Sequence, residues 1–200
     1  EIPWLNYTAY EIRIIGAFVR LGKRREAHEL LDVFLADRRP IEWNQWPEIT
    51  WRDPRSPGHL GDVPHTWIAA EYMLAIAAMV ASEREASEKL VLGSGLPWEW
   101  IAEEEGFSVR GLMTRYGRLD FQMDVPETLC IRFVIGGGMT TPPGGLIVTP
   151  PLPPGRRIRH ALCTAGHPVV IDEHGASVIV KNLPIEATLF LDEAEPPVLA

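Results

Sequence analysis

The chain has 200 residues, of which 46% are hydrophobic and 23% are charged, and its formal net charge is -8. This composition is ordinary for a folded globular protein, and the length allows one large domain or two small ones. The negative charge argues against nucleic acid and against an anionic membrane as partners, because both are negatively charged themselves.

The first residues, EIPWLNYTAY, lack the basic and apolar regions of a signal peptide, so they assign no compartment to the protein. They also lack an initiator methionine, which is expected either of a processed product or of an excised piece of a longer protein. The longest apolar run, 72–81, has about half the length that a membrane span needs. We accordingly predict no membrane as a partner.

The first part of the chain is predicted to be helical. Apolar residues recur at helical spacing in 9–21 and again in 25–37. A short break at 21–23 separates these two segments, which we predict to form a helical hairpin. A third helix is predicted over 64–85, because a proline at its start suits the first helical turn and Asp62 lies near the N-cap position.

The third helix raises a packing problem. Its run 72–81 is apolar nearly all round, and three helices cannot bury such a surface by themselves. Either the helices pack on the second half of the chain, or they belong to a larger helical array, and we expect residues 1–87 to be the end of such an array. Helix faces left exposed in this chain would also favour self-association.

Residues 88–200 are predicted to form an antiparallel β-sandwich. Short segments there alternate in polarity or are rich in β-branched residues, and clusters of glycine and proline separate them. The clearest such segments are 118–123, 128–135, 145–149, 177–181 and 187–191. A short helix is predicted over 97–105. The predicted fold class is therefore α+β, with a helical part over 1–87 followed by the sandwich over 88–200.

The two cysteines, Cys130 and Cys163, are interpreted as buried thiols, with one disulfide as the alternative. Neither a C-x-x-C motif nor a zinc-type spacing is present.

The stretch 42–67, EWNQWPEITWRDPRSPGHLGDVPHTW, is the most informative part of the sequence. Glycine and proline interrupt it, so it cannot be one regular helix or strand. It holds four of the seven tryptophans together with several carboxylates and two histidines. Sugars stack their C–H faces on indole rings while carboxylates and imidazoles bind their hydroxyl groups, so this composition predicts a saccharide pocket.

Glu48 is the candidate catalytic residue. A carboxyl group between Trp46 and Trp51 would lose part of its hydration, which suits a general acid in glycoside hydrolysis. The alternative is a surface glutamate that simply follows a proline. The predicted substrate-binding residues are Trp43, Trp46, Trp51, Asp53, His59 and His65. For Asp53, a role as a turn residue before a proline is the alternative.

His59 and His65 lie six residues apart, a separation that does not match a metal-binding pair on one helix face. A ligand-binding or orienting role is predicted for at least one of them instead. The sequence accordingly predicts no metal site and no cofactor.

The order of these features resembles a known family. A helical hairpin, a Trp-rich loop, the segment GHLGDVPHTWIAAEYML and an antiparallel sandwich follow one another at the C-terminal end of (α/α)6-barrel glycosidases such as the α-L-rhamnosidases. The chain also looks like the tail of large bacterial proteins described as factor 5/8 type C domain proteins. The resemblance implies the last helices of a six-hairpin toroid, a closing β-sandwich and a carbohydrate-active parent protein.

Two functions follow as hypotheses. The first is the C-terminal portion of a glycoside hydrolase that acts by carboxylate general acid/base chemistry on an oligo- or polysaccharide. If that is correct, the fragment alone should be inactive, because part of the catalytic machinery would lie elsewhere. The second is a non-catalytic carbohydrate-binding or structural interaction module. The sandwich has few aromatic residues, so the Trp-rich loop is the better candidate site in either case.

Overall fold

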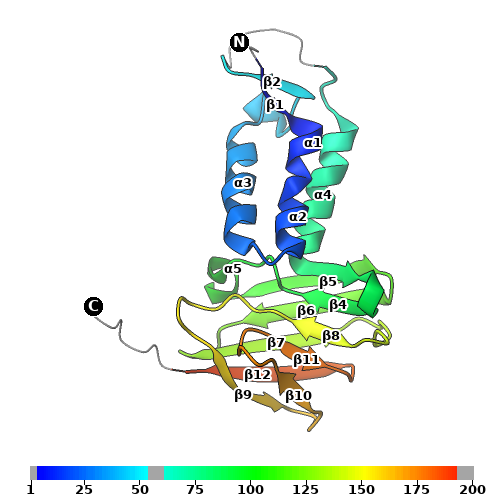
Figure 1. Cartoon of the computed structure of the whole chain (residues 1–200), viewed down its shortest axis with the longest axis vertical. Coiled ribbons are helices and arrows are strands. Elements are labelled where there is room, and N and C mark those ends of the chain that lie inside the picture. Colours follow the sequence, from blue (N-terminus) through cyan, green and yellow to red (C-terminus); the bar gives the residue numbers. More distant parts are fainter. Residues whose placement is uncertain (1–3, 54–60, 193–200) are drawn as a thin grey trace, which may run out of the picture. The chain divides into compact units, whose positions relative to one another are not determined.

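The computed structural model describes residues 4–53 and 61–192. The chain divides into two compact units, Glu1–Met79 and Val80–Ala200, which we call the helical unit and the sandwich unit (Figure 1). The fold class is α+β. The division falls before the predicted limit at 87, because the third helix ends earlier and the residues after it join a sheet.

The helical unit combines four helices with one small antiparallel sheet in its described part (Figure 1). In chain order, its elements are β1 (Trp4–Tyr7), α1 (Thr8–Ile12), α2 (Ile14–Arg20), α3 (Arg24–Ala36), the 3-10 helix η1 (Ile41–Trp43), β2 (Ile49–Trp51) and α4 (Thr66–Val80). Helices α1 to α3 confirm the helices predicted from the spacing of apolar residues in 9–21 and 25–37. Strands β1 and β2 pair with each other, so the Trp-rich loop returns to the start of the unit.

A single apolar core holds the helical unit together. Five apolar residues at the predicted helical spacing point into it from the first three helices, and each is buried: Ile12, Ile15, Val19, Leu31 and Phe34. From α4, one stripe joins this core, formed by Ile68, Ala75, Ala78 and Met79. The named residues of the first three helices therefore need no partner chain for their burial.

The third predicted helix is shorter than the sequence suggested at both ends. It begins at Thr66, and the amide of Ala69 donates to the carbonyl of His65 at 3.2 Å. Asp62 thus lies outside the first turn and is not its N-cap. The helix ends at Val80, because the next residues form strand β3 (Ala81–Arg84) and pair with β4.

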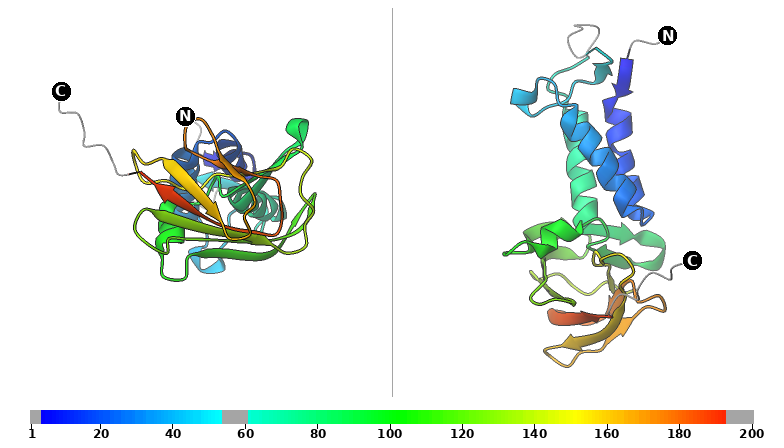
Figure 2. Two further views of the ribbon diagram at one scale, coloured as in Figure 1. Left: turned by 90° about the horizontal axis from the view of Figure 1, so that it is seen from below. Right: turned by 90° about the vertical axis from the view of Figure 1, so that its left-hand side faces the viewer.

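The sandwich unit consists of two five-stranded sheets, seen from two further directions in Figure 2. The first has the order β10-β11-β8-β4-β3 and the second β5-β6-β7-β12-β9. After β3, the strands are β4 (Lys89–Leu92), β5 (Phe107–Thr114), β6 (Gly117–Asp124), β7 (Cys130–Gly136), β8 (Leu146–Val148), β9 (Ile158–Cys163), β10 (Val169–Ile171), β11 (Val178–Val180) and β12 (Ile185–Leu191). Two short helices, η2 (Glu85–Ser87) and α5 (Trp98–Ala102), complete the described part of the unit.

Alternation along the strands builds the sandwich core. In β7, every second residue is buried, and these residues are Ile131, Phe133 and Ile135. They pack with inward-facing side chains of both sheets, among them Phe121 and Val148. The sheets are antiparallel, as predicted, except that β4 pairs with β8 in parallel.

Both cysteines are free thiols. Cys130 begins β7 and Cys163 ends β9, and each is half-buried rather than fully buried as the sequence suggested. Burial and the charge of Glu127 raise the pKa of the Cys130 thiol.

Candidate functional site

Glu48 lies immediately before strand β2, at the edge of the small sheet of the helical unit. Because β1 and β2 are antiparallel with Tyr7 opposite Ile49, the Tyr7 side chain comes next to Glu48. The Tyr7 hydroxyl donates a hydrogen bond of 2.7 Å to Oε1 of Glu48. The amide of Thr8 donates to the Glu48 carbonyl at 2.9 Å. Backbone and side chain together therefore fix Glu48 against the start of α1.

The Tyr7–Glu48 hydrogen bond also changes the acidity of the phenol. It raises the pKa of Tyr7 above its ordinary value of about 10, with smaller contributions in the same direction from burial and from the negative charge of Glu48. Tyr7 is consequently a neutral donor at physiological pH. The Glu48 carboxyl group acts as the acceptor of this pair.

A row of rings extends from Tyr7 across the N-terminal ends of α1 and α4. The ring centroids of Tyr7 and Tyr10 lie 4.8 Å apart, those of Tyr10 and Trp67 4.9 Å, and those of Trp67 and His65 6.2 Å. We call Tyr7, Tyr10, Trp67 and His65 the aromatic row. Tyr10 is 45% exposed, with the Arg13 guanidinium carbon 5.1 Å from its ring centroid, and Trp67 is 36% exposed, so both rings are partly accessible to a ligand.

Gly61 covers the other side of Glu48. Its φ of +66° is in the left-handed region that favours glycine. A Cβ atom at this position would lie 2.1 Å from Oε2 of Glu48. The close approach of this backbone to the carboxylate therefore requires a glycine and narrows the space around Glu48.

His65 ends the row, with Asp62 near one ring nitrogen and no partner for the other among the described residues. Its Nδ1 lies 3.9 Å from Oδ2 of Asp62, and its side chain is only 14% exposed. Its Nε2 is buried and has no hydrogen-bond partner among the described residues. Asp62, predicted as a helix cap, therefore lies beside His65 beyond hydrogen-bond distance.

The structure places the three predicted tryptophans in different environments. Trp46 is 5% exposed and donates from Nε1 to the carbonyl of Phe34 at 2.6 Å, so it belongs to the core of the unit. Trp43 is 60% exposed in η1. Trp51 is half-buried in β2, where its carbonyl accepts a hydrogen bond of 2.7 Å from Arg39.

The structure describes one of the two remaining predicted site residues, Asp53. Asp53 is exposed, two residues after the end of β2. His59 lies outside the described residues. A cavity of about 270 Å³ does exist in this unit, lined by Leu35, Arg38, Asn44, Tyr72 and Met73 among others. Of the predicted site residues that the structure describes, only Trp46 is among those lining it.

Sequence reasoning missed Tyr7 and Tyr10, which lie far before the Trp-rich loop in the chain. Their spacing of three places both rings at the start of the first helix, and this was the available signal. What the sequence could not provide was the pairing of β1 with β2, which brings Tyr7 to Glu48. Trp67 was included in the Trp-rich stretch but was not among the predicted ligand-binding residues.

Among the described residues, no group of three or more histidine, cysteine, aspartate or glutamate side chains could hold a metal ion. No helix in that part of the chain is long and apolar enough to cross a membrane. Comparisons of the chain with protein-family models, with curated proteins and with solved structures found no match.

Proposed function

We propose that this chain is the C-terminal portion of a carbohydrate-active protein and that its helical unit binds a saccharide at Glu48 and the aromatic row. The observation that supports this most directly is the exposed pair of Tyr10 and Trp67 beside a carboxylate fixed by Tyr7. Exposed rings offer apolar faces to the C–H groups of a sugar, and the carboxylate accepts its hydroxyl groups. The Trp-rich loop contributes Glu48 and Gly61 rather than its tryptophans Trp43 and Trp46.

Affinity electrophoresis of the full chain through gels that contain soluble polysaccharides tests this binding. We expect retardation by at least one polysaccharide, and Trp67→Ala should weaken it roughly tenfold or more. Glu48→Gln should weaken it as well. Trp43→Ala is the matched control, because Trp43 is an exposed tryptophan of the same unit outside the row. If no polysaccharide retards the chain, or if Trp67→Ala binds as well as the parent sequence, the site is wrongly assigned.

A hydrolytic role of Glu48 is the stronger form of the same proposal. General acid/base hydrolysis takes a pair of carboxyl groups, and Glu48 would supply one of them. In the complete natural protein, Glu48→Gln should then lower kcat by about 100-fold, the usual scale of such a contribution, with little change in Tm. An increase in KM at unchanged kcat would instead assign Glu48 to binding alone.

We also propose that the helical unit is the end of a larger α/α array. Exposed apolar residues support this, because they follow helical spacing. Along α2 and just after its end, they are Ile14, Ala17 and Leu21. Along α4, outside the aromatic row, they are Ala70, Met73 and Leu74. We call these two sets the exposed stripes. An apolar stripe at this spacing is what a helix presents to another helix, so the occupant that fits it is a further amphipathic helical hairpin.

A further inference from the structure

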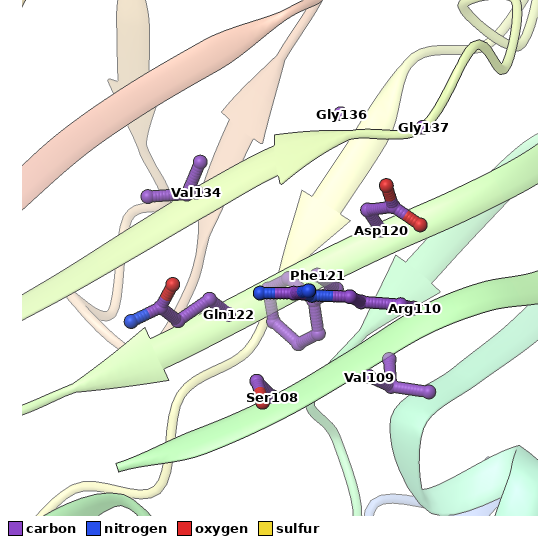
Figure 3. A pocket seen from close by; sticks show the side chains of 9 residues that line it. All are labelled: Ser108, Val109, Arg110, Asp120, Phe121, Gln122, Val134, Gly136 and Gly137. Carbon is purple, nitrogen blue, oxygen red and sulfur yellow. The ribbon is translucent and has the colours of Figure 1, made fainter. Parts of the chain in front are cut away.

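The outer face of the second sheet contains a polar hollow of about 390 Å³ (Figure 3). It lies where β5, β6 and β7 run side by side, in the sandwich unit. The polar side chains that line it are Ser108, Arg110, Asp120 and Gln122, and the glycines Gly136 and Gly137 form one end. Nothing in the proposed saccharide site of the helical unit involves these residues.

Missing side chains at the end of β7 create the hollow. Outward positions of β6 carry Asp120 and Gln122, whereas the neighbouring end of β7 carries Gly136 and Gly137. Gly137 has a φ of +92°, and a Cβ atom there would lie 2.5 Å from the amide nitrogen of Asp120. The glycine therefore lets the backbone approach β6 closely and leaves the space above it open.

An irregularity in β5 holds one of the polar groups in place. The register between β5 and β6 shifts between Val109 and Leu112, and the amide of Gly111 donates to Oδ1 of Asp120 at 2.6 Å. One oxygen of Asp120 is thereby fixed. The same irregularity carries Arg110, which is exposed at the mouth of the hollow.

The charged groups point to different ends of the hollow. Figure 3 shows the Arg110 side chain in front of Phe121 with its guanidinium end toward Gln122. The Asp120 carboxylate is turned toward Gly136 and Gly137 instead. Within the described residues, the side chains of Arg110 and Gln122 have no hydrogen-bond or ion-pair partner. A cation with an adjacent amide therefore faces the hollow at one end, and a carboxylate faces it at the other.

We propose that this hollow binds a hydroxylated carboxylate, the group found in uronic acid sugars and in open-chain hydroxy acids. The guanidinium of Arg110 presents donors in a planar fork that matches a carboxylate, and the Gln122 amide adds a further donor. Asp120 accepts hydrogen bonds from hydroxyl groups at the other end, whereas the Ser108 hydroxyl, opposite Gln122 in the β5–β6 pairing, adds a donor at the carboxylate end. Because Asp120 repels a second anion, the ligand has its charge at one end and its hydroxyl groups at the other.

The ligand's charge also explains why this site needs no aromatic platform. A neutral sugar depends on stacking, which this hollow does not offer. A carboxylate gains its affinity from charge-assisted hydrogen bonds, which are roughly twice as strong as neutral ones. The sandwich unit would thus recognise charge, and the aromatic row would recognise an apolar sugar face.

NMR titration of the full ¹⁵N-labelled chain tests the proposal, with the amides of Gly136 and Gly137 as reporters. The probes are methyl β-D-glucuronide, methyl β-D-glucoside, which lacks the carboxylate, and gluconate, which is an open-chain hydroxy acid. We expect saturable shifts with the glucuronide or with gluconate, and at least tenfold weaker binding of the glucoside. A preference between the glucuronide and gluconate shows whether the site takes the cyclic or the open-chain ligand.

Arg110→Gln should weaken carboxylate binding at least tenfold, and Arg110→Lys should restore part of it because the charge remains without the fork. Arg115→Gln is the matched control, since Arg115 is an exposed arginine in the turn of the same β5–β6 hairpin and is not among the residues that line the hollow. Tyr7→Phe and Glu48→Gln should leave these shifts unchanged, which separates this site from the proposed saccharide site. The proposal is overturned if neither carboxylate shifts the reporters, if the glucoside binds equally well, or if a folded Arg110→Gln variant binds normally.

Discussion

The hydrogen bond from Tyr7 to Glu48 joins the first described strand to a loop some forty residues away in the chain, and it raises the pKa of Tyr7. At this scale, a residue's role depends on its partner more than on its type. Trp46 and Trp43 are three residues apart, yet one is a core residue with a buried indole donor and the other is open to solvent. Both were predicted from the sequence to bind a ligand, because composition alone does not distinguish a buried tryptophan from an exposed one.

Tyr7 should make stability depend on alkaline pH. Folding raises its pKa above about 10, so the folded state holds the phenol proton more tightly than the unfolded chain does. The corresponding stabilisation is complete below about pH 10 and is lost as the pH rises through the raised pKa. We expect Tyr7→Phe to remove this part of the decline in urea midpoint between pH 9 and pH 11.

The control for the alkaline experiment is Tyr116→Phe, which removes a phenol of the sandwich unit and keeps the Tyr7–Glu48 pair. Its slope of stability against pH should match that of the parent sequence. Equal slopes for the parent and for Tyr7→Phe would show that the Tyr7–Glu48 hydrogen bond does not couple folding to this proton.

Trp46 should matter for stability rather than for ligand binding. Trp46→Ala removes a large buried ring and leaves the Phe34 carbonyl without its indole donor, at a cost of about 3–5 kcal/mol. Trp43→Ala should change the free energy of unfolding by less than about 0.5 kcal/mol, because Trp43 is mostly exposed. Urea denaturation monitored by circular dichroism measures both, and similar losses for the two variants would contradict the assignment of Trp46 to the core.

At the scale of elements, the periodicity of apolar residues predicted those helices and strands whose conformation follows from the local sequence. The spacing of apolar residues found the helices α1 to α3, and alternation found β6, β7 and β12. Strand β3 was assigned to the preceding helix, because Ala81–Arg84 continues an apolar helix without a glycine or proline to end it. Its strand conformation comes from pairing with β4, a tertiary effect that a local pattern does not contain.

The candidate site was predictable in part for the same reason. Glu48 and His65 lie in one segment whose composition stands out, and both contribute to the site. Tyr7 and Tyr10 come from another segment and reach Glu48 and Trp67 through the packing of β1 against β2 and of α1 beside α4. The polar hollow of the sandwich unit gave no signal, because an arginine and a glutamine on neighbouring strands look like any solvated sheet face.

The two glycines that follow β7, Gly137 and Gly138, should respond differently to substitution by alanine. Gly137→Ala adds a methyl group 2.5 Å from the Asp120 amide at a positive φ, so we expect a loss of about 2–4 kcal/mol. Gly138 also has a positive φ but has open space around it, so Gly138→Ala should cost about 1–2 kcal/mol. Thermal unfolding of both variants measures the difference, and a larger loss for Gly138→Ala would contradict the tight approach of β7 to β6.

At the scale of the whole molecule, the exposed stripes of the helical unit give a prediction for the behaviour of the chain in solution. We expect the chain to self-associate through them, because contiguous apolar surface on a soluble protein is usually covered by a partner. The double variant Ile14→Glu and Leu74→Glu adds charge to both stripes and should shift the chain toward the monomer. Sedimentation velocity across the micromolar range measures this.

The control for sedimentation is Glu29→Lys, which changes charge on the exposed polar face of α3. It should leave the degree of association as it is in the parent sequence. A compact monomer at every concentration of the parent sequence would remove self-association from the proposal and leave the stripes to a different partner.

The parallel pairing of β4 with β8 has a consequence for the order in which the sandwich unit folds. Leu90 pairs with Leu146, and the whole of β5, β6 and β7 lies between them in the chain. The β3–β4 hairpin emerges early during synthesis, but its inner edge has no strand to pair with until β8 has followed. Closing so large a loop is entropically slow. The second sheet, whose β5, β6 and β7 are consecutive hairpins, therefore has the kinetic advantage and would serve as the template on which the first sheet assembles.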